Sequence, residues 1–178
     1  KRLAVLLAAS GPLLLPTAAH ATEQEWHIGA STGFAMLDFP RGLARYGFGG
    51  GVHARYGLTD AIDFTMNATL YGYPDDARIA PGTSVGIDYV IDVSRWLPTI
   101  GVTAGFVDLI GFRCEEAPIH CGHIPMPAVS VPFSFGYRVT PQLPIGLRLE
   151  YQLLPIGLLA GSGPDQQFFV GVFGAFAR

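Results

Sequence analysis

Ionisable side chains that could do chemistry occupy alternate positions along several runs of this chain. Asp63, Asp88, Arg148 and Glu150 each stand between two apolar neighbours. Because successive residues of a β-strand point to opposite faces, these charges are expected to share one face of their strands. A set with both signs could form ion pairs, relay protons or line a path for ions. Its members are His27, His53, Arg55, Asp63, Asp88, Asp92, Arg138, Arg148 and Glu150.

We expect these charges to pair with one another. In the hairpin centred on Thr59, Arg55 and Asp63 fall about opposite each other, at cross-strand distances of roughly 4.5–5.5 Å between Cβ atoms. The other expected pairs join Arg138 and Arg148 to Glu150, Asp88 or Asp92. An unpaired charge in a narrow interior costs about 3–5 kcal/mol. The sequence therefore favours an ion-pair network that closes the interior over a conducting pore or a proton relay.

A nucleophile and base would need a Ser and a His about 3 Å apart. His27 and Ser31 share a strand face, but four residues of extended chain separate them by about 13 Å. His53 could approach either one from a neighbouring strand. We predict no catalytic residue.

A short segment rich in Cys and His raises the question of a metal site. Cys114 and Cys121 lie close together, with His120 and His123 beside them. In an exported chain a loop disulfide between the cysteines is the expected state. Metal binding by the two histidines is an alternative, but we predict no metal and no cofactor. The run Gly49–Gly51 lacks the lysine and helix of a phosphate loop and is interpreted as part of a strand.

The elements that position these residues follow a period of two almost everywhere after Thr22. Pro132 interrupts one run, because a proline cannot donate to a ladder. At Asp108 the alternation fails, which predicts a bulge or the exit from an apolar layer. The expected strands fall within residues 26–34, 52–56, 62–70, 84–96, 100–106, 129–138, 146–153 and 167–178. Tight turns are expected at 58–60, 97–99 and 140–142, and longer connections at 38–46, 73–83, 113–126 and 154–165.

The first 21 residues have the pattern of a secretory signal peptide. Lys1 and Arg2 precede an apolar run that ends in Ala19-His20-Ala21, an A-x-A cleavage site. Residues 22–178 then form one domain. The chain has a formal net charge of −3, and no basic patch suggests nucleic acid as a partner.

Two features favour lipid over a soluble sandwich core as the environment of the apolar faces. Large apolar residues continue through every strand on one face, while the other face carries small and charged residues. Aromatic residues are expected at both membrane interfaces: Trp26, Tyr56, Trp96, Tyr137 and Phe176 near the tight turns, Tyr73 and Phe112 near the long loops. In lipid every backbone group must be paired internally. The fold prediction is therefore all-β, an eight-stranded antiparallel up-and-down transmembrane barrel.

With its leader, its alternation of short and long connections, and turn segments such as "YGLTDAID" and "YRVTPQLPIGLRLEY", the chain resembles the small outer-membrane barrels of the OmpA/OmpX/OmpW type. It differs at its end, where Arg178 replaces the usual final aromatic residue, so a displaced assembly signal at Phe176 is expected. The resemblance implies residence in the bacterial outer membrane. It also implies contact with outer-membrane lipid and lipopolysaccharide, and insertion by the barrel-assembly machinery.

A structural or surface-interaction role is the favoured function, with a partner of the outer loops that the sequence does not identify. Transport of a small solute or hydrophobic compound is the alternative. An enzyme that modifies outer-membrane lipid is the least favoured interpretation.

Overall fold

The computed structural model describes residues 24–38, 44–74, 78–111, 123–155 and 165–178. The predicted signal peptide, Cys114, Cys121, His120 and Phe112 lie outside these residues. No helix in the described part of the chain is long and apolar enough to cross a membrane.

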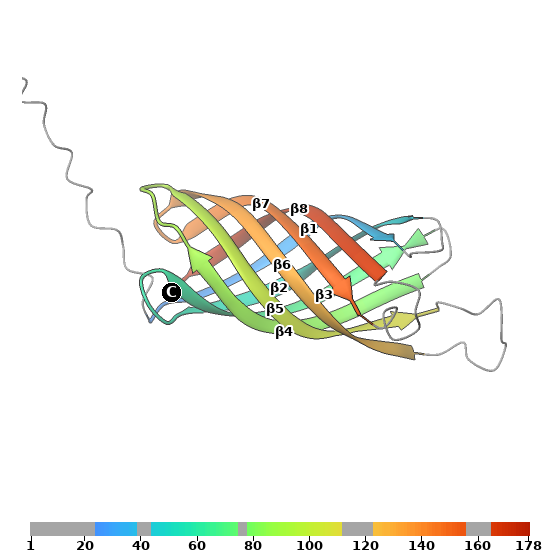
Figure 1. Cartoon of the computed structure of the whole chain (residues 1–178). Coiled ribbons are helices and arrows are strands. Elements are labelled where there is room, and N and C mark those ends of the chain that lie inside the picture. The colour runs from blue at the N-terminus through green and yellow to red at the C-terminus, as the bar shows by residue number, and fades with distance from the viewer. Residues whose placement is uncertain (1–23, 39–43, 75–77, 112–122, 156–164) are drawn as a thin grey trace, which may run out of the picture.

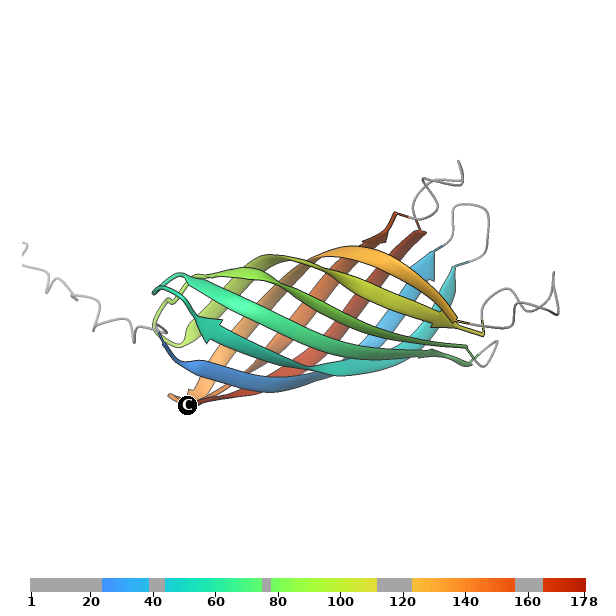
Figure 2. The same ribbon diagram turned by 90° about the horizontal axis from the view of Figure 1, so that it is seen from below.

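Eight antiparallel strands close into one barrel in chain order, as predicted (Figure 1). Strand β8 returns to pair with β1, for example Gly33 with Gly171. The strands are β1 (Trp26–Asp38), β2 (Arg45–Gly57), β3 (Ile62–Tyr73), β4 (Arg78–Val90), β5 (Trp96–Ile110), β6 (His123–Thr140), β7 (Leu143–Leu154) and β8 (Asp165–Ala177). Figure 2 shows the strongly tilted strands and the closed wall from a second side. No sheet edge is left unpaired, which is the requirement for β-structure in lipid.

Most strands run further than the period-two runs suggested, but the predicted strand 84–96 is too long at its end, because β4 ends at Val90 and residues 91–95 lead into a turn. One tight turn was therefore misplaced. Leu97, Pro98 and Thr99 belong to β5 rather than to a turn. The turn lies just before them, where Val93 bridges Trp96 and Ser94 takes a φ of 62°. Pro98 is compatible with the strand because its carbonyl accepts the N–H of Ile91 at 2.9 Å.

The connection between β3 and β4 is also shorter than expected. Strand β4 already begins at Arg78, so most of the predicted long connection 73–83 is strand. Its alternation continues through exposed Ile79 and buried Ala80. The Leu58–Asp60 and Thr140–Gln142 turns lie where they were predicted, between β2 and β3 and between β6 and β7. We call this end of the barrel, at the left in Figure 1, the tight-turn end.

Pro132 and Asp108 both lie in regular strands, and neither marks a bulge. Pro132 pairs with Glu150 of β7, while the β5·β6 ladder has no pair between Ile100↔Phe133 and Thr103↔Ser130. The register is the same on both sides of this gap. The pairing of β5 and β6 also continues unshifted through Asp108. Asp108 therefore marks the predicted exit from the apolar layer, because its side chain bonds His123 at the exposed end of the wall.

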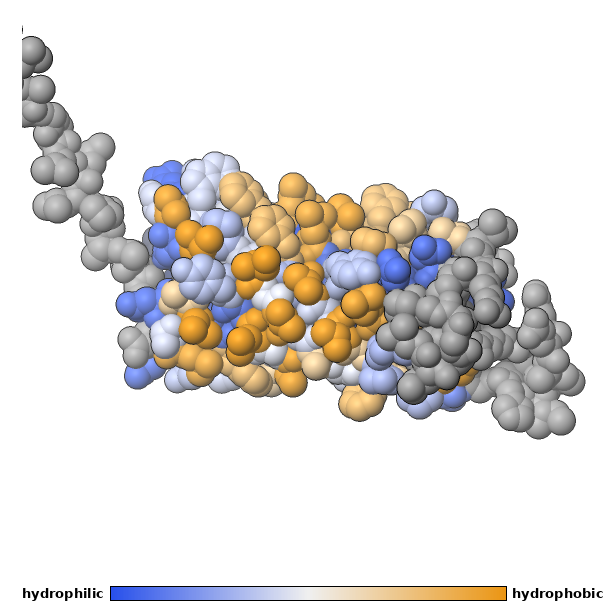
Figure 3. All heavy atoms as spheres, viewed as in Figure 1, coloured by the Kyte–Doolittle hydropathy of each residue, from blue (hydrophilic) through white to orange (hydrophobic). Residues whose placement is uncertain are grey.

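The two faces of the wall carry different residues. Large apolar side chains such as Ile28, Phe34 and Val102 are exposed on the outside, and Figure 3 shows such residues gathered over the middle of the barrel. The buried positions between them face the interior and include Asp63, Arg148 and Glu150. This distribution suits a barrel with lipid outside and a narrow interior packed with side chains.

Candidate functional site in the barrel interior

The interior near the tight-turn end is crossed by an ion pair between Arg138 and Asp92. Arg138 Nη1 and Nη2 donate to Asp92 Oδ1 and Oδ2 at 2.9 and 2.8 Å, a two-pronged arrangement. Nη1 also donates to the carbonyl of Ser94 at 3.2 Å. Because Asp92 follows β4 and Arg138 lies in β6, the pair reaches over the start of β5. Paired guanidinium and carboxylate groups of this geometry are among the stronger polar contacts in proteins.

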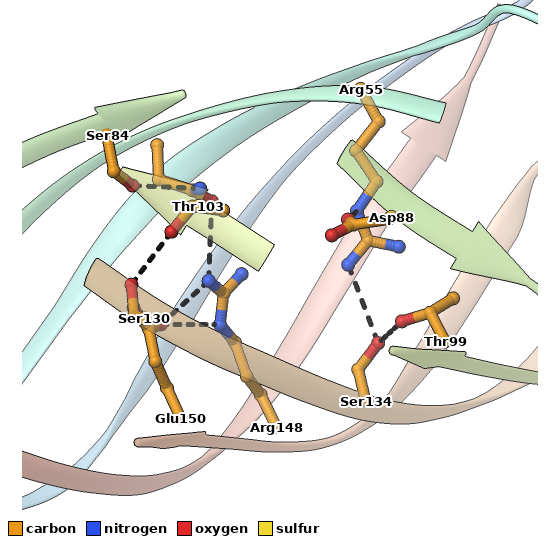
Figure 4. A network of polar contacts seen from close by, with 10 residues as sticks. Arg55, Ser84, Asp88, Thr99, Thr103, Ser130, Ser134, Arg148 and Glu150 are labelled. Carbon is orange, nitrogen blue, oxygen red and sulfur yellow. Dashed lines mark hydrogen bonds and ion pairs between the residues drawn. The ribbon is translucent and has the colours of Figure 1, made fainter. Parts of the chain in front are cut away.

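Arg55 pairs with Asp88 rather than with Asp63. Its Nε lies 3.1 Å from Asp88 Oδ2, and its Nη2 donates to Ser134 Oγ at 3.5 Å. These contacts join β2 to β4 and to β6, as Figure 4 shows. The expected pairing with Asp63 was wrong.

The register of the β2–β3 hairpin explains this difference. Arg55 lies opposite Thr65, and Asp63 lies opposite Gly57. The expectation had centred the turn on Thr59, whereas the N–H groups of Leu58 and Thr59 both reach the carbonyl of Ile62. The longer turn displaces the register by two residues, which keeps each side chain on its predicted face but changes its neighbour.

Arg148 and Glu150 form the third pair, within β7. Arg148 Nε and Nη2 donate to Glu150 Oε2 at 3.2 and 2.8 Å. Nη2 also donates to Asn67 Oδ1 at 3.3 Å on the opposite wall. The Asn67 amide continues the network by donating to Ser84 Oγ.

Hydroxyl pairs add neutral links between β5 and β6. Thr103 and Ser130 hydroxyls lie 2.7 Å apart, and Thr99 bonds Ser134, which also accepts from Arg55. Together with the Arg55–Asp88 and Arg148–Glu150 pairs they make up the polar contacts of Figure 4. The bond from Arg148 to Asn67 links opposite walls of the barrel.

Asp63 is the carboxylate of the set with the poorest local pairing. It is 3% exposed, its Oδ1 has no hydrogen-bond partner, and Asp88 lies directly opposite it on β4. One guanidinium, that of Arg55, therefore serves the neighbourhood of two carboxylates. Such a like-charged cross-strand pair is destabilising by itself.

A small cavity near the tight-turn end is lined by His27, His53, Arg55 and Asp63, with Phe173 also on its wall. Its volume is about 30 Å³, room for about two water molecules. His53 lies opposite Gly29 on β1, midway between His27 and Ser31. No hydrogen bond joins Ser31 to either histidine in the described part of the chain. No three His, Cys, Asp or Glu side chains among the described residues are placed to hold a metal ion.

The opposite half of the interior holds most of the buried apolar side chains, which the sequence analysis did not predict. Polar and charged residues are buried at the same end: Arg78, Gln152, Asp165 and Gln167. The side chains of Leu37, Met126 and Leu154 are fully buried there. Tyr73, expected in an outer aromatic belt, is 1% exposed and lies inside. We call this group the apolar lumen cluster: Ala35, Leu37, Tyr71, Tyr73, Ala80, Val107, Leu109, Met126, Ala128, Leu154 and Phe169.

The signal for this cluster was the strand parity itself. Leu37 keeps the parity of His27, and Leu154 keeps that of Glu150, so both had to face inward. Gly49 makes room in the wall, because a Cβ there would lie 2.4 Å from the Tyr71 ring. This agrees with the interpretation of Gly49–Gly51 as part of a strand.

Comparisons with known proteins concern the fold. No protein-family model and no curated protein sequence matches the chain. Neisserial surface protein A (NspA) is similar with a TM-score of 0.66 and 13% identity, over 85% of this chain and 96% of that chain. The N-terminal barrel domain of Pseudomonas aeruginosa OprF is similar with a TM-score of 0.65 and 13% identity, over 88% of this chain and 98% of that chain. Ail, the attachment invasion locus protein of Yersinia pestis, is similar with a TM-score of 0.56 and 11% identity, over 88% of this chain and 99% of that chain. The chain thus has the fold of the small eight-stranded outer-membrane β-barrels.

Proposed function

We propose that this protein resides in the bacterial outer membrane, where it has a structural or surface-interaction role and its interior is plugged by its own side chains. The observation that carries this proposal is the packing of the barrel interior. Ion pairs and hydroxyl pairs cross one half, and the apolar lumen cluster packs in the other, together with buried Arg78, Gln152, Asp165 and Gln167. A continuous wet path for solutes would have to pass both.

The balance of charge in the network supports a plug over an ion path. Each of the three arginines predicted to face the interior has a carboxylate within ion-pair distance: Arg55 with Asp88, Arg138 with Asp92, and Arg148 with Glu150. Selective ion paths are instead lined by an excess of one sign. Paired charges bridge the walls and leave little for a passing ion to bind.

The location follows from the wall and from the similar folds. An apolar outer surface makes outer-membrane lipid and lipopolysaccharide the immediate partners of the barrel, and the barrel-assembly machinery is the proposed route of insertion. Two proteins of similar fold are named a surface protein and an attachment invasion locus protein. Those names support an interaction role, which we place in the connections at the end opposite the tight turns.

Single-channel recording in a planar lipid bilayer tests the plug. We expect no large, steady conductance from the unmodified protein. The matched control is Asp60→Asn, which removes an exposed charge outside the interior and is expected to be equally silent. Large, steady conductance in the unmodified protein would contradict the plug and favour transport. Turnover of lipopolysaccharide or phospholipid by the purified protein would instead favour an enzyme.

A further inference from the structure

The turn between β4 and β5 carries an exposed arginine, Arg95, which is held in place beside aromatic residues at the tight-turn end. Arg95 Nη1 donates to the Tyr137 hydroxyl at 3.3 Å. Its backbone is fixed as well, because its carbonyl accepts the N–H of Arg138 at 2.8 Å. Trp96, the next residue, packs against Tyr137 and Phe135 at centroid distances of 4.9 and 5.0 Å. A cation is thus presented at the level where an aromatic belt meets lipid headgroups.

An apolar groove lies on the same wall, further along β5. Four residues separate Trp96 from Ile100, roughly 13 Å of strand, which is the direction from headgroup to hydrocarbon. The groove has a volume of about 370 Å³, within the range of about 300–1,000 Å³ found for small-ligand pockets. Its lining residues are Ile62, Ile87, Asp88, Tyr89, Ile100, Gly101, Val102 and Val131.

The local sequence explains why the wall is hollowed here. The β5·β6 ladder lacks pairs at Gly101 and Val102, opposite Pro132 and Val131. The larger side chains around the gap, including Ile87 and Tyr89, remain exposed. They form the sides of the groove.

We propose that Arg95, Trp96, Tyr137 and this groove form a binding site for one phospholipid, with its phosphate at Arg95 and an acyl chain in the groove. The occupant is argued from charge and order. Arg95 is cationic and exposed, a phosphate is anionic, and guanidinium is well suited to phosphate oxygens. The cation, the aromatic pair and the groove follow one another in the order of a phospholipid's own parts. This site rests on the proposed membrane location of the barrel.

Fluorescence quenching by brominated lipid tests the site with the full chain. Trp26→Phe leaves Trp96 as the single tryptophan, because the chain has two. The protein is placed in phosphatidylcholine vesicles that contain a small fraction of either brominated phosphatidylglycerol or brominated diacylglycerol, which lacks the phosphate. We expect about fivefold enrichment of the phosphate-bearing lipid at Trp96, the order expected for one basic residue near an anionic headgroup.

Arg95→Gln in the same background is expected to abolish the difference between the two brominated lipids. Val131→Phe, which fills the groove, should weaken quenching by both. Arg178→Gln is the matched control, because it removes another exposed arginine at the same end and should leave the preference unchanged. Free inorganic phosphate should not compete, since it lacks the acyl chain.

The outcomes separate this site from the proposed membrane location. If neither brominated lipid quenches Trp96, the barrel is not in the bilayer and the proposed function fails with the site. If both quench equally in the unmodified Arg95 protein, the barrel is inserted but the phospholipid site is wrong. The same conclusion follows if Arg95→Gln keeps the preference.

Discussion

At the scale of single residues, Arg55 and Asp88 are the most informative pair. Asp88→Ala removes the carboxylate that lies 3.1 Å from the buried Arg55 guanidinium. We expect a loss of about 3–5 kcal/mol in the free energy of unfolding. Arg55→Ala combined with Asp88→Ala should cost less than the sum of the two single changes, because contacting residues are coupled. Urea unfolding of the barrel in lipid vesicles measures all three; strict additivity would contradict the pair.

Asp63 supplies a control, because its substitution is not expected to lower the free energy of unfolding. It faces Asp88 across β3 and β4, so Asp63→Asn removes a like-charge contact of roughly 0.2–1 kcal/mol. We expect the same urea experiment to give unchanged or slightly higher stability. A loss as large as that of Asp88→Ala would mean that Asp63 is the true partner of Arg55.

The sequence predicted the face of each of these charges better than it predicted their partners. Period two fixes whether Asp63 and Arg148 face inward, whatever the register. The partner depends on where the turn is centred. A shift of two residues in the β2–β3 register places Thr65 rather than Asp63 opposite Arg55. Arg55 forms its ion pair with Asp88 of β4 instead. Arg148 and Glu150 lie on one strand, so their contact is independent of register.

At the scale of elements, the turn between β2 and β3 depends on the Thr59 hydroxyl. Thr59 Oγ1 accepts the N–H groups of Ala61 and Ile62 at 3.3 and 3.1 Å. Thr59→Ala should therefore lower the free energy of unfolding by about 0.5–1.5 kcal/mol. Thr59→Ser keeps the hydroxyl and is expected to keep most of the stability. Equal loss in both variants, again by urea unfolding, would show that the methyl group matters rather than the hydrogen bonds.

Two of the strand prolines, Pro81 and Pro132, lie where a ladder has gaps. The β4·β5 ladder lacks pairs between Ile79↔Ile110 and Gly82↔Val107, a gap that contains Pro81. The gap at Pro132 has the same form, with unshifted register on both sides. Since Pro132 still pairs with Glu150 on β7, its missing N–H faces β5. A proline thus removes a ladder bond without ending the strand.

Pro132→Ala should restore a donor toward β5. We expect slower amide hydrogen exchange at Gly101 and Val102, measured by NMR on the folded protein. Pro127→Ala is the matched control, because Pro127 lies beyond Val129↔Leu153, where the β6·β7 ladder ends. An N–H at position 127 that faces β7 would find no partner there, so amide exchange at Gly101 and Val102 should be unchanged. Faster exchange near Gly101 in Pro132→Ala would contradict the assignment.

The ends of the elements were less predictable than their middles for the same reason. Pro98 was interpreted as part of a turn, yet it lies in β5 and its carbonyl accepts the N–H of Ile91. Ser94, with its positive φ, marks the real turn, and a single serine carries little signal for it.

At the scale of the whole molecule, closure into a barrel was predictable and the division of the interior was not. Alternating faces and the apolar exterior are set residue by residue. The mixture of polar and apolar layers inside depends on which inward positions share a level, and tilted strands bring distant residues such as Leu37 and Met126 together. Sequence reasoning followed the charged residues and overlooked the inward leucines.

Two barriers of different chemistry therefore close the interior, and conductance should require the loss of both. One variant removes all three ion pairs by alanine at Arg55, Asp88, Asp92, Arg138, Arg148 and Glu150. A second variant opens the apolar lumen cluster by alanine at Leu37, Met126 and Leu154, each buried and each costing about 2–5 kcal/mol. We expect neither variant alone to conduct in a planar bilayer and the combined variant to do so, provided circular dichroism still reports a folded β-barrel. Conductance in the first variant alone would show that the charged network is the only gate and that the apolar half admits water and ions. Conductance in the second alone would assign closure to the apolar cluster, and the ion pairs would then serve stability only.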